Sequence, residues 1–231
     1  MKLFNCEQNP RLASIFPAGV DTPLGKVLLN VKIDKVQIAA IKATESYQLQ
    51  NDTHFLCWYQ DDFDLELLIG RPVLHLPVPA IVQDCIAGMW RLKPHKDLEN
   101  ILFTAEWSPG YSWRKGSPDS GEGLYAKTWW DKGNTVSIGT EDEKWLAFRA
   151  SRNAMLPPRL ENYFKQGFFD ELVHYDLQET GLPIPIASLR VGELCQVHFS
   201  VAWSDNVSGD ASTWYAVKCS PTDILDGCEC S

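Results

Sequence analysis

Apolar residues occupy every second position along several short segments of the chain, and this alternation limits the folds that the chain can adopt. The clearest case is LCQVHFSVAW at 194–203, where apolar residues alternate with Gln196, His198 and Ser200. A period of two is typical of a β-strand that buries one of its faces. The alternation therefore predicts a protein built mainly from strands.

About ten segments fit this description. Segments 27–33 and 36–40 are separated by two residues and are predicted to form a hairpin, and 54–60 and 64–70 are predicted to form a second pair. A third hairpin with a long loop is predicted for 195–219. The other predicted strands are 98–107, 123–130, 135–140, 144–150 and 213–219, while 84–92 fits either a strand or a short helix.

Two segments rich in proline interrupt this pattern. Three prolines in 71–82 exclude a central strand or a helix, because proline has no N–H to donate. We therefore expect an extended segment that crosses the surface or lies at a sheet edge. Residues 181–193 are predicted to form a second crossing of this kind.

One long helix is predicted for residues 159–177. Pro157 and Pro158 suit its first turn, and apolar residues then recur at helical spacing until Gly181 and Pro183 end it. Strands and helices do not alternate, so a parallel sheet is not expected. The predicted class is α+β, mainly antiparallel β: a bent sheet or sandwich with one long helix packed on one face. We expect a single domain, 1–231, and a boundary would fall near 151–158.

The charge and hydropathy of the chain narrow the classes of partner that it can bind. The chain has 231 residues, of which 45% are hydrophobic, and a net charge of −9. An acidic surface repels nucleic acid and anionic membranes, and it suits a small molecule or a basic protein partner. No run of 18 apolar residues is present, and the residues after Met1 lack the apolar core of a signal peptide. These features predict a cytoplasmic protein that does not engage membranes.

The seven cysteines support the same location. Their number is odd and most lie inside apolar runs, which is typical of reduced, buried thiols. Cys219, Cys228 and Cys230 would supply three ligands to a zinc ion, but they lack the paired spacing of zinc modules. We therefore expect no metal and no other cofactor.

The stretch from Ala105 to Gly133 is the most promising region for a ligand, because it concentrates large aromatic residues. Exposed tryptophan and tyrosine bind flat apolar surfaces. The residues proposed to bind a ligand are Trp107, Tyr111, Trp113 and Trp129. The alternative is that these residues belong to the core. Neighbouring residues on a strand point to opposite faces, so Trp129 and Trp130 need either a second covering layer or a ligand.

Motifs for catalysis are absent from the sequence. It contains no G-x-S-x-G, no phosphate-binding loop and no dinucleotide fingerprint, and its histidines are scattered. The acidic groups at 61–64 and 141–143 are interpreted as solvated turns rather than acid–base pairs. No catalytic residue is assigned, and a non-enzymatic role is favoured.

Two functions fit these observations. The first is a cytoplasmic, non-catalytic interaction protein, whose acidic surface and aromatic-rich sheet engage a protein partner. The second is a small-molecule binder, or an enzyme that uses carboxylates, with a pocket lined by tryptophan and tyrosine. A closed apolar cavity with a buried carboxylate or His198 at its wall would favour the second.

Overall fold

Two antiparallel β-sheets dominate the protein. The computed structural model describes residues 2–6, 11–12, 18–34, 36–38, 43–49, 51–77, 79–109, 116–131, 133–167, 180–205 and 211–231. Within these residues the larger sheet has nine strands, in the order β1 (Arg11–Leu12), β5 (Glu45–Gln48), β6 (His54–Tyr59), β7 (Phe63–Gly70), β8 (Asp84–Pro94), β14 (Cys195–Ser204), β12 (Asn134–Glu141), β11 (Leu124–Asp131) and β10 (Gly116–Gly121).

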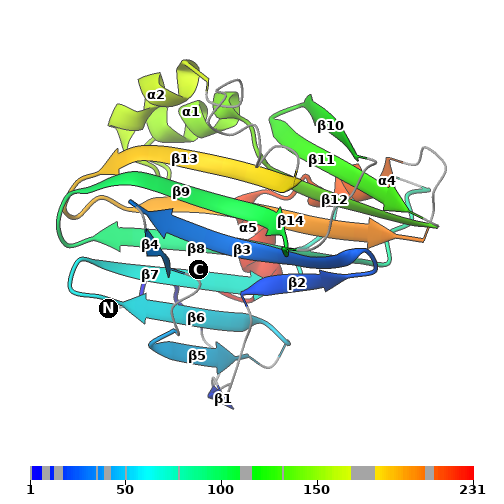
Figure 1. Cartoon of the computed structure of the whole chain (residues 1–231), viewed down its shortest axis with the longest axis horizontal. Coiled ribbons are helices and arrows are strands. Elements are labelled where there is room, and N and C mark those ends of the chain that lie inside the picture. The colour runs from blue at the N-terminus through cyan, green and yellow to red at the C-terminus, as the bar shows by residue number, and fades with distance from the viewer. Residues whose placement is uncertain are drawn as a thin grey trace.

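The smaller sheet lies across one face of the larger one (Figure 1). Its strands within the described residues are β13 (Gly181–Leu189), β9 (Leu98–Trp107), β3 (Gly25–Ile33) and β2 (Gly19–Thr22), in that order, with β4 (Val36–Gln37) paired to β3. The described helices are short: α1 (Glu143–Ser151), η2 (Pro158–Leu160), α2 (Glu161–Lys165), α4 (Ser212–Val217) and α5 (Pro221–Gly227). The class is therefore mainly antiparallel β, as predicted.

The main core lies between the two sheets. The Trp90 ring of β8 lies 6.4 Å from the Phe103 ring of β9, centroid to centroid. A Cβ atom on Gly88 would come within 2.3 Å of Leu29 Cδ1, so this glycine allows the sheets to approach closely. The apolar residues of the predicted alternation fill this space, which explains why the strands 54–60, 64–70, 98–107 and 194–203 were predicted correctly.

A second apolar cluster covers the opposite face of the larger sheet. It joins Phe4, Leu68 and Met89 to Val217 and Ile224 of the C-terminal helices. The centre of the larger sheet is thus buried on both faces. Because of this, the supposedly polar face of β14 is also buried, and His198 is only 1% exposed.

The predicted long helix at 159–177 is wrong. Within the described residues, α2 ends at Lys165 and Gly167 has a φ of +78°. A left-handed glycine after the last turn is a common helix terminator, and the Gly167 N–H donates to the carbonyl oxygen of Phe164. Residues 168–179 lie outside the described part of the chain. The longest described helix, α1, has nine residues.

Two segments predicted to be strands are helices. Residues 144–150 fall within α1, where the Asp142 side chain caps the helix by accepting from the Trp145 N–H at 2.8 Å. Residues 213–219 overlap α4, so the predicted hairpin at 195–219 is also wrong. A Cβ atom on Gly139 would lie 2.6 Å from Val217 Cγ2, so β12 lets α4 pack directly on the sheet.

The proline segments have different outcomes. Residues 71–82 lie outside the described strands and helices, as predicted. The second crossing is instead the edge strand β13, which pairs with β9. Pro183 and Pro185 are two residues apart, so both imide nitrogens point away from β9 and no ladder bond is lost. Residues 84–92, left open between strand and helix, belong to β8.

Candidate functional site

A pocket of about 220 Å³ opens where β11, β12, α1 and the connection between α4 and α5 meet. Its inner side carries Thr140 and Glu141 from the end of β12, and its rim carries Trp145 from α1. The remaining lining residues are Glu122, Gly123, Leu124, Lys218, Cys219, Ser220 and Asp223. Segments from three distant parts of the sequence therefore build one site.

A tight turn forms one wall. Glu122 and Gly123 join β10 to β11 with φ angles of +55° and +85°. Two central residues with positive φ form the hairpin turn whose twist matches antiparallel strands. A Cβ atom on Gly123 would lie 3.8 Å from the Trp145 side chain, so the turn backbone packs beside the indole.

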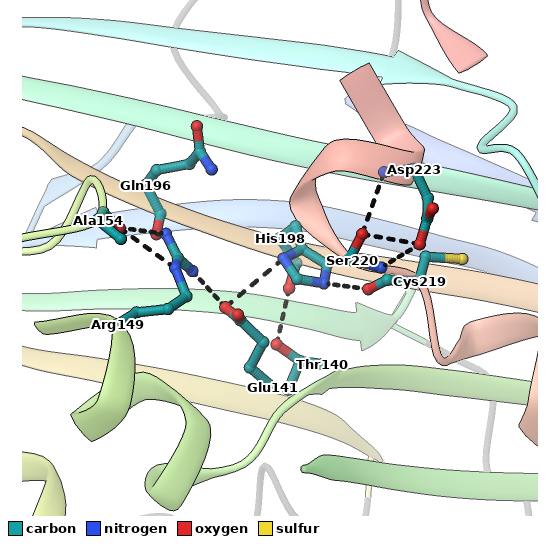
Figure 2. Close-up of polar contacts among 9 residues, drawn as sticks. All are labelled: Thr140, Glu141, Arg149, Ala154, Gln196, His198, Cys219, Ser220 and Asp223. Atoms are coloured by element: carbon teal, nitrogen blue, oxygen red, sulfur yellow. Dashed lines mark hydrogen bonds and ion pairs between the residues drawn. The ribbon is translucent and has the colours of Figure 1, made fainter. Parts of the chain in front are cut away.

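A buried ion pair lies on the inner side of the pocket. The guanidinium of Arg149 donates to Glu141 Oε2, and the two side chains are only 7% and 5% exposed. Arg149 also donates to the carbonyl oxygens of Ala154, at 3.1 Å, and Gln196, at 3.1 Å (Figure 2). This guanidinium therefore holds the Glu141 carboxylate in one position, although burial of charge is costly.

His198 lies between Glu141 and Cys219 (Figure 2). Its Nε2 is 3.0 Å from the carbonyl oxygen of Cys219. A carbonyl oxygen can only accept, so Nε2 carries the proton and Nδ1 of the neutral ring has a free lone pair. Burial lowers the pKa of His198, and the nearby Glu141 carboxylate only partly opposes that effect. The imidazole is therefore neutral at neutral pH.

Two buried acceptor atoms consequently lack a donor. Neither Glu141 Oε1 nor His198 Nδ1 has a hydrogen-bond partner among the described residues. Nδ1 lies 3.7 Å from the other oxygen of the same carboxylate, so one small group has both acceptors within reach. A buried acceptor without a donor costs about 1–3 kcal/mol. We call these two atoms the acceptor pair.

Most charged side chains of the outer wall have a polar or oppositely charged partner. Lys218 pairs with Glu122 across the mouth. The Asp223 carboxylate accepts from the Ser220 N–H and hydroxyl, both at 2.8 Å, and its other oxygen lies 3.2 Å from His75 Nε2. The bond from the Ser220 N–H, together with the Asp223 N–H that donates to Ser220 Oγ at 3.1 Å, forms the capping box of α5. The acceptor pair is therefore the part of this region with unmet hydrogen bonding; Glu141 lines the pocket, and His198 lies behind the lining residues.

An aromatic surface adjoins the pocket. The Trp145 and Phe148 rings stack with their centroids 5.1 Å apart, and the residues are 45% and 46% exposed. The guanidinium of Arg152 lies 5.3 Å from the Phe148 centroid. Exposed aromatic residues next to a pocket are typical of ligand-binding surfaces.

The structure describes two of the four residues predicted to bind a ligand, Trp107 and Trp129. Trp107 and Trp129 are buried in the main core, where their rings meet edge to face with centroids 5.5 Å apart. Neither lines this pocket. Tyr111 and Trp113 lie outside the described residues. Residues 124–131 do form a strand, with Trp129 buried and Trp130 half-buried.

The acidic segment at 141–143 differs from its prediction as a solvated turn. Glu141 is buried and Asp142 caps a helix. In the other group, Asp62 makes a surface ion pair with Lys96, and Asp64 Oδ2 lies 3.1 Å from His95 Nε2. Sequence reasoning missed Glu141 because its partner Arg149 lay in a segment predicted to be a strand.

The prediction that all the cysteines are reduced thiols is partly wrong. Cys6 and Cys230 form a disulfide, so the expectation of reduced thiols is wrong for these two, whereas the other five cysteines are buried and unbonded. Cys230 is thus not available for the zinc site that its spacing left open. In the described part of the chain, no group of three or more metal-binding side chains is placed to hold an ion.

Comparisons with known proteins identify no family. No family model and no curated protein matches the chain. Among solved structures, a putative kojibiose phosphorylase from the human microbiome is similar over 87% of this chain, with 8% identity and a TM-score of 0.47. The chain spans about a quarter of that protein's length, 26%. Over the described residues, no helix has the length and apolar character needed to cross a bilayer.

Proposed function

We propose that the protein binds a small polar molecule in the pocket between Trp145 and Glu141. The observation that carries this proposal is the acceptor pair, which leaves two buried atoms in need of a donor. Glu141 is itself a lining residue. A ligand that brings N–H or O–H groups to this end of the pocket removes the penalty of the unmet acceptors.

The charges of the pocket restrict the ligand class. The lining residues include three carboxylates, on Glu122, Glu141 and Asp223, and one amine, on Lys218. Arg149 offsets the charge of Glu141 from behind. An anionic ligand would meet like charges and would bring further acceptors to the acceptor pair. We therefore expect a neutral or cationic ligand, rich in donors, with one apolar face for Trp145.

The test is a binding screen on the whole chain. Small polar molecules in three charge classes, neutral, cationic and anionic, are screened by thermal shift and confirmed by calorimetry. The screen should yield binders from the first two classes. Trp145→Ala should weaken their binding at least about tenfold, the loss of about 1.4 kcal/mol of contact. Tyr215→Ala is the matched control, because Tyr215 is an exposed aromatic residue on a helix that does not line the pocket.

Two results would contradict the proposal: no binder in any class, or binders that Trp145→Ala leaves unaffected. A preference for anions would contradict the charge argument alone.

A protein partner remains the second candidate, and the exposed Trp145–Phe148 stack is the observation that supports it. The nearby Arg152 makes an acidic partner surface the better complement at this position, rather than the basic one first expected. The cytoplasmic location is also a proposal. Five unbonded thiols support it, whereas the Cys6–Cys230 disulfide argues against it.

A further inference from the structure

Two buried thiols meet beneath the pocket. Cys85 lies at the start of β8, and Cys219 lies in the connection between α4 and α5. Both thiols donate to the carbonyl oxygen of Ala216, at 3.4 and 2.9 Å. The two sulfur atoms thus lie around one carbonyl oxygen, and a bond between them requires the chain to shift until they meet.

We propose that Cys85 and Cys219 are a modification site, which a peroxide converts into a second disulfide. The site is independent of whether the pocket binds a ligand. Cys219 is 9% exposed and belongs to the pocket wall, so it is the thiol of the pair that lies nearer to a small oxidant from outside. The other unbonded cysteines, Cys57, Cys195 and Cys228, are 0% exposed.

The reaction balances with hydrogen peroxide as the oxidant. The Cys219 thiolate attacks one peroxide oxygen, the O–O bond breaks, and hydroxide leaves and takes up the thiol proton as water. Cys219 is then a sulfenic acid. The Cys85 sulfur attacks the Cys219 sulfur, the S–S bond forms, and the second hydroxide leaves as water with the Cys85 proton. Two electrons pass from the two sulfurs to the peroxide.

The order of the two cysteines follows from their surroundings. Cys85 is 2% exposed, less than Cys219. The neighbouring Cys219 thiol and burial raise the pKa of Cys85, so it stays protonated until Cys219 has been oxidised. Cys85 is therefore the resolving thiol and Cys219 the one that meets the oxidant.

Bond formation also changes the pocket. A disulfide needs its sulfurs about 2 Å apart, so the connection that carries Cys219 must move toward β8. Lys218 and Ser220 flank Cys219 and line the pocket with it. The Cys219 carbonyl also accepts from His198. Oxidation thus shifts three consecutive wall residues and the hydrogen bond that fixes the histidine tautomer.

The experiment counts thiols in the whole, folded chain. The protein is treated with hydrogen peroxide, denatured and alkylated without reduction, and the adducts are counted by intact mass. Five thiols are expected before treatment and three after it. Peptide mapping should find one new bond, between Cys85 and Cys219. Reduction before alkylation should return all seven cysteines in both samples.

Three variants test the role of each cysteine in the reaction. Cys219→Ser should keep its four thiols under peroxide. Cys85→Ser should stop at the sulfenic acid of Cys219, which a cyclic 1,3-dione traps. Cys57→Ser is the matched control and should fall from four thiols to two. A wild-type count that stays at five, or a new bond between any other pair, would overturn the proposal even if no variant folds.

Discussion

Replacing Arg149 with methionine tests how the candidate site is held together. The substitution removes the counter-ion of Glu141 while keeping a long side chain in the same space. Removing one partner of a buried ion pair typically costs about 3–5 kcal/mol, because the other charge is left unpaired. The buried carbonyl oxygen of Gln196 also loses a donor. We therefore expect the free energy of unfolding to fall by that amount.

The assay is thermal and urea unfolding. A chain of 231 residues gains about 2.1 cal/mol/K of unfolding entropy per residue, so each kcal/mol moves the Tm by about 2 °C. Arg149→Met should therefore lower the Tm by about 6–10 °C. Adding Glu141→Leu removes the orphaned charge and should recover most of this loss. Arg152→Met is the control, because Arg152 is exposed, and it should change stability by less than about 0.5 kcal/mol.

Two outcomes would refute this reasoning. One is an Arg149→Met protein within about 1 kcal/mol of wild type, which would show that the ion pair does not form. The other is a double variant no more stable than Arg149→Met, which would show that the charge of Glu141 was not the source of the loss.

Three further predictions concern the rest of the fold. Burial lowers the pKa of His198, so the unfolded chain takes up the histidine proton at a higher pH than the folded chain does. The free energy of unfolding should therefore fall as the pH drops below about 6.5. His198→Gln should flatten this pH dependence in urea titrations, and identical slopes in the two proteins would contradict the prediction. Replacing Cys6 and Cys230 with serine opens a loop of 224 residues and should lower the free energy of unfolding by up to about 5 kcal/mol in the same assay. An unchanged urea midpoint would count against the Cys6–Cys230 disulfide. Gly139→Ala should cost about 1–3 kcal/mol, because the new methyl group meets Val217, and a neutral effect would show that α4 does not pack there.

The strands were predictable wherever one face of a strand met the main core. The alternation in 54–60 and 98–107 arises because every second side chain enters the space between the sheets. The same pattern misled in 213–219, where bulky residues favour a strand by propensity. There, contact with the sheet at Gly139 selects a helix instead.

Some signals were present in the sequence but outweighed by others. Ser220, Pro221 and Asp223 carry the residue types of a capping box with proline at the first helical position, and they begin α5. Gly167 falls inside the predicted helix at 159–177, and α2 ends just before it. The spacing of Pro183 and Pro185 is compatible with an edge strand, although prolines usually argue against any strand.

The candidate site was only partly predictable. A closed apolar cavity with a buried carboxylate or His198 at its wall was the expected sign of a binding site. Glu141 does line the pocket, but the pocket opens at the surface and carries several charged residues. The sequence could not place the two together, because 57 residues separate Glu141 from His198. Their contact depends on the pairing of β12 with β14 and on the packing of the C-terminal helices over His198.

The most direct measurement is a crystal structure of the protein at a resolution that shows ordered water and bound small molecules. The account predicts a donor atom, from water or from a captured ligand, at about 2.7–3.2 Å from both Glu141 Oε1 and His198 Nδ1. A direct hydrogen bond between the imidazole and the carboxylate, with no third group between them, would contradict it.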